Sequence, residues 1–200
     1  MGRPREHDDQ TRAALLAAAE ELLSRQGEQG LAVRAVADAV GTTTRAVYSV
    51  FGGKDGLLRA LYVRAFTLLG ERVAGVRASD DPAADLVAVG VRGFRWFATT
   101  HPNLFRLTFE GSHPELAPTT DDIGSAVAAR RRLSFWVARC AEAGRLGGRD
   151  VADVTWQFHA LCQGLASVEL RGWLPRGRDP ARVWRDALEA FVAGLAARRS

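Results

Sequence analysis

The sequence predicts an all-α protein, and three observations carry that prediction. Apolar side chains recur at helical spacing along the chain, whereas the alternation typical of strands is scarce. Alanine, leucine, arginine and glutamate, which favour helices, dominate the composition. Glycine, proline and capping residues divide the pattern into about nine helices. With 47% hydrophobic and 25% charged residues, the 200-residue chain lies near the globular average, which excludes collagen-like and disordered chains.

The first four helices are expected at residues 9–26, 33–40, 44–51 and 54–77. Asp9 can cap the first of them, and Gly27 lies just past its end. The second is amphipathic and ends at Gly41. Thr43 can cap the third, which a glycine pair separates from the fourth.

The later helices are expected at residues 82–100, from 102 to a loop at 110–120, and at 122–143, 150–170 and 180–197. Aspartate or histidine followed by proline marks three of these starts. We place a domain boundary inside or just before the fourth helix, and take residue 69 as the end of the first domain. This gives an N-terminal domain at residues 9–69, with a helix-turn-helix at about 32–51, and a C-terminal domain at residues 70–200.

Charge and cysteine content narrow the function classes. The net charge is +4, yet residues 1–60 hold eight cations and eight anions, so nucleic-acid binding is permitted but not demanded. Two cysteines, Cys140 and Cys162, cannot form a disulfide framework and fit a reduced, cytoplasmic setting. The polar start makes a secretory signal unexpected. The longest apolar run, residues 154–168, is too short to span a membrane, so no membrane partner is expected.

Enzymatic motifs are absent from the sequence. It holds no Walker A, G-x-G-x-x-G, H-E-x-x-H or G-x-S-x-G pattern, and its four histidines do not cluster with acids. We therefore expect no enzyme, no catalytic residue and no cofactor. His159 and Cys162 share a helix face, but no further ligands have helpful spacing, so a core pair is favoured over a metal site.

The two short helices joined at a glycine turn form a helix-turn-helix pattern. The third helix has a polar outer side on which Arg45 can read a guanine edge and Tyr48 can reach a phosphate. Arg34 and Lys54, at helix starts, can hold backbone phosphate. The predicted DNA-binding residues are Arg34, Thr43, Thr44, Arg45, Tyr48, Ser49 and Lys54. From periodicity alone, a small three-helix core with a solvated face is an equal alternative.

A resemblance to a known family separates these alternatives. Residues 11–61 resemble the N-terminal domain of the tetracycline-repressor (TetR) family. The matching positions are Ala37, Gly41, Tyr48, Phe51, Lys54, Asp55 and Leu57. The resemblance implies a homodimeric repressor that binds double-stranded DNA at a palindromic site and responds to a small effector, which shifts the fourth helix. Ala32, Val50 and Gly53 depart from the family pattern, which puts the individual DNA contacts in doubt.

Aromatic residues gather in the later part of the chain, and all five tryptophans lie beyond residue 95. Such a cluster is typical of an apolar ligand pocket, although for any single ring a packed core is the plainer interpretation. The predicted ligand-binding residues are Trp96, Phe97, Phe105, Phe109, Trp136, His159 and Gln163. The segments at 101–109 and 164–170 resemble a TetR subgroup named for a Trp-His-Gly signature, although Gln163-Gly164 stands where His-Gly is usual.

The last two helices are the predicted dimer contact. The final helix carries a wide apolar stripe, and the helix before it is apolar nearly all round. Two such helices from each subunit can form a four-helix interface, and the family resemblance implies the same. The arginine run at 130–132 is assigned to a solvated helix face. The alternative function is that of a helical adaptor protein without a DNA role.

Overall fold

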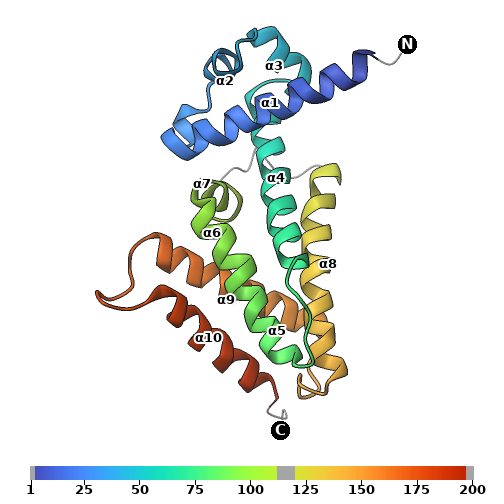
Figure 1. The fold of residues 1–200 in the computed structure, drawn as a ribbon, viewed down its shortest axis with the longest axis vertical. Helices are drawn as coiled ribbons and strands as arrows, with labels where there is room; N and C mark the ends of the chain where they lie inside the picture. Colours follow the sequence, from blue (N-terminus) through green and yellow to red (C-terminus); the bar gives the residue numbers. More distant parts are fainter. Residues whose placement is uncertain (1–2, 112–119, 197–200) are drawn as a thin grey trace. The chain divides into compact units, whose positions relative to one another are not determined.

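The structure is a computed structural model that describes residues 3–111 and 120–196. Within those ranges every regular element is helical, which confirms the predicted all-α class (Figure 1). The elements are α1 (Arg3–Gln26), η1 (Glu28–Gly30), α2 (Val33–Val40), α3 (Thr44–Phe51), α4 (Lys54–Ala74), α5 (Pro82–Ala88), η2 (Val89–Arg95), α6 (Trp96–Thr100), α7 (Pro102–Phe105), η3 (Arg106–Glu110), α8 (Thr120–Glu142), α9 (Val151–Leu170) and α10 (Pro180–Leu195). None of the helices in the described ranges is long and apolar enough to cross a membrane.

The chain divides into two compact units, each with its own core. The described residues of Met1–Ala65 and His101–Ile123 make the first, and those of Phe66–Thr100 and Gly124–Ser200 make the second. A single boundary at 69/70 does not describe this grouping, because the segment from residue 101 packs with the N-terminal helices. The functional division at that boundary stays a prediction. The loop predicted at 110–120 falls mostly on residues 112–119, outside the described ranges.

The first unit is built around the N-terminal helices. Their inward faces supply completely buried side chains, which are Leu15, Ala19, Leu31, Val36, Val47, Leu57 and Leu61. Leu15 and Ala19 of α1 are four positions apart, as are Leu57 and Leu61 of α4, and Val47 and buried Phe51 have the same spacing in α3, so each of these helices turns one apolar stripe to the shared core. Because the core uses only this stripe, the opposite side of each short helix remains in solvent.

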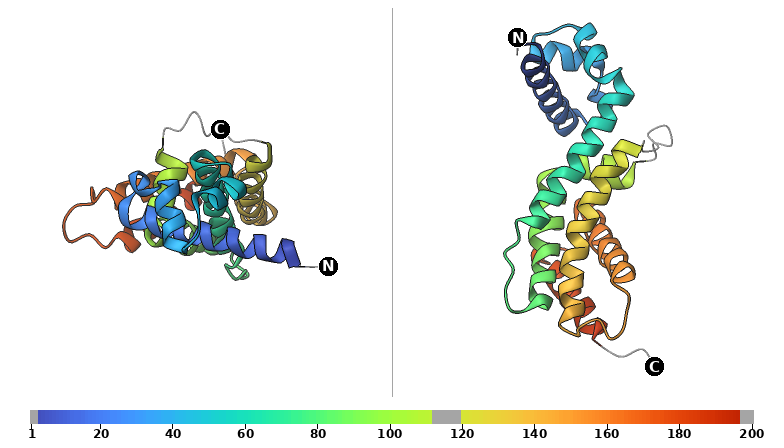
Figure 2. Two further views of the ribbon diagram at one scale, coloured as in Figure 1. Left: turned by 90° about the horizontal axis from the view of Figure 1, so that it is seen from above. Right: turned by 90° about the vertical axis from the view of Figure 1, so that its right-hand side faces the viewer.

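The second unit packs the end of α4 against α8, and α10 against α5, η2 and α9 (Figures 1 and 2). Trp136 of α8 is buried, and its Nε1 donates to the carbonyl oxygen of Val73, 3.2 Å away. Glu169 of α9 accepts two hydrogen bonds from Arg95 and one, at 2.8 Å, from the indole of buried Trp184. These bonds satisfy polar groups that burial would otherwise penalise.

The largest differences from the predicted helices occur in three places. The first helix begins at Arg3, six residues early, because Pro4 is compatible with a first helical turn. The fourth ends at Ala74, where Gly75 and the buried side chain of Val76 turn the chain. The helix predicted at 82–100 is interrupted by η2, a π-helical segment whose wide turn contains two glycines packed against neighbouring helices.

Candidate nucleic-acid interface and ligand pocket

The turn between α2 and α3 is closed by backbone hydrogen bonds. Gly41 adopts the left-handed conformation, with a φ of 70°, which other residues rarely adopt. The amide of Gly41 donates to Asp38 and that of Thr42 to Ala37, which together form a Schellman motif. Thr43 then caps α3, since its Oγ1 accepts the amide of Ala46 at 3.3 Å. These local bonds fix the boundaries of both helices where the sequence predicts them.

Two sides of α3 have different environments. Val47 and Phe51 are buried in the first unit. The polar side is exposed, and Tyr48 keeps 57% of its surface in solvent. All seven predicted DNA-binding residues are exposed: Arg34, Thr43, Thr44, Arg45, Tyr48, Ser49 and Lys54. The structure thus leaves each of these side chains accessible to a nucleic acid, and their contact with DNA stays a prediction.

The cationic side chains on this surface form few and weak ion pairs within the described part of the chain. Arg34 lies 3.9 Å from Asp38 one turn along α2, and both side chains are largely exposed. An exposed pair of this kind contributes little to stability, so Arg34 can exchange it for a phosphate at small cost. Arg45 and Lys54 form no ion pair with any described residue.

One supporting residue was missed by sequence analysis. Arg12 of α1 places its guanidinium 4.9 Å from the centroid of the Phe51 ring and donates to the carbonyl oxygen of Val50 at 3.5 Å. It therefore contacts the last turn of α3 from the neighbouring helix. No local pattern signals this role, because 38 residues separate Arg12 from Val50.

The predicted ligand-binding residues do not all lie in one unit. Phe105 and Phe109 belong to the first, with their ring centroids 5.2 Å apart. The second unit holds the other five, which are Trp96, Phe97, Trp136, His159 and Gln163. Among these, Phe97 and Trp136 are buried, and the other three are partly exposed.

His159 lies among aromatic rings. Its ring is 5.5 Å from that of Phe94 and 5.9 Å from that of exposed Trp156. Burial lowers the pKa of His159, which favours the neutral imidazole. Cys162, one turn away, is completely buried. In the described ranges, no group of three or more His, Cys, Asp or Glu side chains is placed to hold a metal ion.

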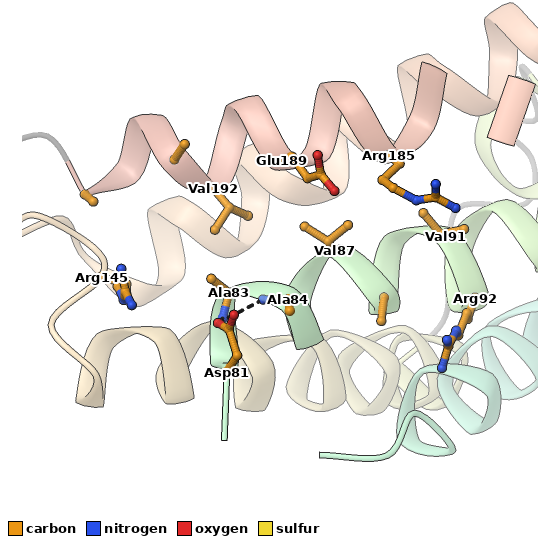
Figure 3. A pocket seen from close by; sticks show the side chains of 13 residues that line it. Asp81, Ala83, Ala84, Val87, Val91, Arg92, Arg145, Arg185, Glu189 and Val192 are labelled. Atoms are coloured by element: carbon orange, nitrogen blue, oxygen red, sulfur yellow. Dashed lines mark hydrogen bonds between the residues drawn. The ribbon is translucent and has the colours of Figure 1, made fainter. Parts of the chain in front are cut away.

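A pocket of about 550 Å³ lies elsewhere in the second unit, between α10 and the helix formed by α5 and η2 (Figure 3). Its walls are mainly alanine and valine side chains, with charged side chains at the edges. None of the seven predicted ligand-binding residues lines it. The aromatic clusters of the sequence give no signal for this pocket, because small side chains leave its space open.

The arrangement of α2, α3 and the polar side of α3 defines a helix-turn-helix protein. Comparison with known families narrows this class, and the chain belongs to the tetR family of bacterial regulatory proteins. The family model described as "Tetracyclin repressor-like, C-terminal domain" matches residues 86–191, and that of "Bacterial regulatory proteins, tetR family" matches residues 15–61. The predicted family is thereby confirmed, and this identity points to a protein that is not an enzyme.

Individual relatives agree with this assignment. HTH-type transcriptional regulator Rv1816 of Mycobacterium tuberculosis is 31% identical over 119 residues, which are 57% of this chain and half the length of that relative. A Rhodococcus sp. RHA1 protein of unknown function has a similar structure, with a TM-score of 0.81 and 27% identity over 94% of this chain and 96% of that one. NalD of Pseudomonas aeruginosa, "the secondary repressor of MexAB-OprM multidrug efflux pump", has a TM-score of 0.66 and 26% identity over 96% and 98% of the two chains.

Proposed function

We propose that this protein is a cytoplasmic DNA-binding transcriptional repressor that binds a palindromic operator as a homodimer and is released by a small, largely apolar effector. The observation that carries the proposal is the exposed polar side of α3, the second helix of a helix-turn-helix inside a segment that matches the tetR family. NalD, a structural relative, is described as a repressor. A helical adaptor without a DNA role is the alternative that the experiments must exclude.

The side chains on this surface divide into two roles. Arg45 is assigned to base reading, because a guanidinium can bond both acceptors on the guanine edge. Tyr48 and the hydroxyls of Thr43, Thr44 and Ser49 are assigned to nearby bases or phosphates. Arg34 and Lys54 are assigned to phosphate, since both lie in the first turn of a helix, where free backbone amides also favour an anion.

The proposed dimer face lies on α9 and α10. The stripe predicted on α10 is only partly used within the chain, because Trp184 and Leu188 are buried whereas Ala187 remains partly exposed. A Cβ atom added at Gly164 of α9 or Gly194 of α10 would meet no atom within 4 Å. Small residues let helices of a second copy approach closely, and a four-helix contact would cover these open positions.

Effector binding is assigned to the aromatic candidates named above. Trp96, Phe97, Trp136, His159 and Gln163 are the members in the second unit, and Phe105 and Phe109 are those in the first. The apolar character of most of these side chains favours an effector that is itself largely apolar.

DNA titration tests the central proposal. The purified protein is titrated onto its own upstream intergenic DNA and onto unrelated DNA by fluorescence anisotropy at several salt concentrations. We expect tighter binding to the upstream DNA and a loss of affinity as salt rises, because phosphate contacts release counterions. The double variant Arg45→Ala with Tyr48→Ala should lose specific binding. Absence of binding to any DNA at low salt would favour the adaptor.

The dimer face is tested by a matched pair of glycine variants. Gly164→Arg places a long cation on the proposed face, whereas Gly124→Arg places one on α8, where an added Cβ also meets no atom within 4 Å. Light scattering should show a monomer for the first variant and a dimer for the second. Two dimeric variants would refute the α9–α10 contact but would leave the DNA proposal intact.

A further inference from the structure

The pocket between α5, η2 and α10 arises from a change in side-chain size along these helices. At Gly90 the helices are so close that an added Cβ would overlap the side chain of Leu188. Toward the start of α5 the facing residues are Ala83, Ala84 and Ala88, whose methyl groups are too short to fill the space. The resulting volume of about 550 Å³ is within the range of small-molecule sites, roughly 300–1,000 Å³.

An apolar floor runs along the middle of this pocket. Figure 3 shows Val87 and Val91 on one side and Val192 on the other, with their side chains directed into the space between the helices. From Ala84 to Arg92 the helix rises by about 12 Å, which leaves room for an extended apolar body. Burial of that body in this groove would remove both surfaces from water.

Three arginine side chains line the pocket beside this apolar floor without an ion pair to any described residue. Arg185 of α10 and Arg92 of η2 lie toward the same end of the pocket, and Arg145 lies toward the other (Figure 3). No ion pair joins any of the three to a described residue. Asp81 is already engaged, because its carboxylate accepts the amides of Ala83 and Ala84 at 3.0 and 3.2 Å.

The Arg185 guanidinium lies at this end of the groove and suits a carboxylate, which accepts charge-assisted hydrogen bonds, whereas the Arg92 side chain is directed away from α10 (Figure 3). We propose that this groove is a binding site for an amphipathic carboxylate, with its apolar body along Val87, Val91 and Val192 and its head group at Arg185. The carboxylate of Glu189, one turn from Arg185, faces the same groove and opposes the bound anion. The site is separate from the aromatic effector candidates and does not depend on DNA binding.

The groove also remains open if the proposed dimer forms. At 100° per residue, Arg185, Glu189 and Val192 lie on one flank of α10. Ala187 and Gly194 of the proposed dimer face lie on the opposite flank, whereas Trp184 and Leu188 are buried within the chain. A second copy on that face would therefore leave the groove accessible to a small molecule.

Calorimetric titration with sodium decanoate, below the concentration at which it forms micelles, tests this site in the full chain. We expect one saturable site per chain, affinity that falls about fourfold for each methylene removed, and no comparable binding of decyltrimethylammonium. Arg185→Gln should weaken binding by about tenfold or more, because it removes a charge-assisted hydrogen bond. Glu189→Gln should tighten binding severalfold, because it removes a like charge.

Two further variants separate this groove from any other apolar site. Arg182 is an exposed cation one turn before Arg185, and its own ion-pair partner is Asp186 at 3.6 Å. Arg182→Gln should therefore leave the affinity for decanoate unchanged. Ala84→Trp, at an exposed position, should fill the groove and abolish binding while the circular dichroism spectrum stays the same. Absence of decanoate binding, or binding that ignores Arg185→Gln and Ala84→Trp, would overturn the proposal.

Discussion

The side-chain amide of Asn103 donates a hydrogen bond to the carbonyl oxygen of Leu23, with 2.8 Å between Nδ2 and O. The same amide donates to Ser24 at 2.9 Å. The Leu23 oxygen also accepts the amide of Gly27, whereas the carbonyl groups after it have no partner within the helix, so Asn103 helps to close the end of α1 from a distant part of the sequence. His101 adds a second link, since its Nδ1 lies 3.1 Å from Glu20. These contacts explain why α7 belongs to the unit that carries the helix-turn-helix.

Removal of the Asn103 amide should loosen the end of α1. Asn103→Ala deletes both hydrogen bonds and should reduce local stability by about 1 kcal/mol. Amide hydrogen exchange at Gln26 and Gly27 should therefore become about fivefold faster. Thr99→Ala is a matched control, because its hydroxyl bonds only within its own helix, to Arg95 and Trp96. Unchanged exchange at Gln26 and Gly27 would show that the contact does not hold α1.

The start of α4 should tolerate no side chain at Gly56. A Cβ atom there would overlap the carbonyl oxygen of buried Phe51, and backbone cannot move aside as a flexible side chain can. Gly56→Ala should lower the free energy of unfolding by about 1–3 kcal/mol. Gly124→Ala, at an open position in α8, should instead raise it by about 0.5–1 kcal/mol. Thermal unfolding followed by circular dichroism measures both, and equal melting temperatures would contradict the proposed clash.

The helix-turn-helix could be predicted from the sequence because its signals are local. The hydrogen bonds at Gly41 and Thr43 join groups within five residues of each other, so the adjacent sequence is enough to predict them. The buried positions Val36 and Val47 follow from helical spacing alone. The same signals predict which side of α3 is exposed, but they do not show which exposed side chain touches DNA.

Three other features could not be predicted from the sequence, because they depend on contacts between segments far apart in the chain. The docking of Asn103 on α1 joins residues about 80 positions apart, and no periodicity reveals it. The π-helical turn of η2 accompanies close packing at Gly90 against Leu188, which is set by a helix almost 100 residues later. The α5–α10 pocket was missed for the same reason, because alanines on one helix look like ordinary core until the facing helix is placed.

Stability of the second unit should depend on the ionisation of Asp85. Burial by itself raises the pKa of Asp85, but hydrogen bonds from Ser79 and the Arg139 guanidinium outweigh it and hold that pKa below its usual 3.8. The ionised carboxylate therefore adds stability that is fully present above about pH 4 and is lost as the pH falls through the folded-state pKa. The hydrogen bonds and ion pair around Asp85 should therefore stabilise the second unit less in acid than at neutral pH.

Asp85→Asn tests this dependence. At pH 7 the variant should be less stable by about 1–3 kcal/mol, and the difference should shrink as the pH is lowered toward 3. Urea unfolding followed by tryptophan fluorescence reports on this unit, since it contains all five tryptophans. Asp80→Asn, at an exposed site in the same loop, should track the unchanged protein at every pH. A constant difference between pH 3 and 7 would contradict the role of the carboxylate.

The two thiols should be unreactive until the second unit unfolds. Burial raises the pKa of Cys140 to about 11, and its Sγ donates to the carbonyl oxygen of Pro82 at 3.2 Å. Cys162 is completely buried, and burial raises its pKa as well. Because the thiolate is the reactive form, a disulfide reagent at pH 8 should modify neither residue in the folded protein and both in denaturant. The Cys140→Ala variant shows which of the two thiols gives each step of the reaction with the reagent. Rapid reaction of one thiol without denaturant would show that this cysteine is exposed by a local opening of the unit.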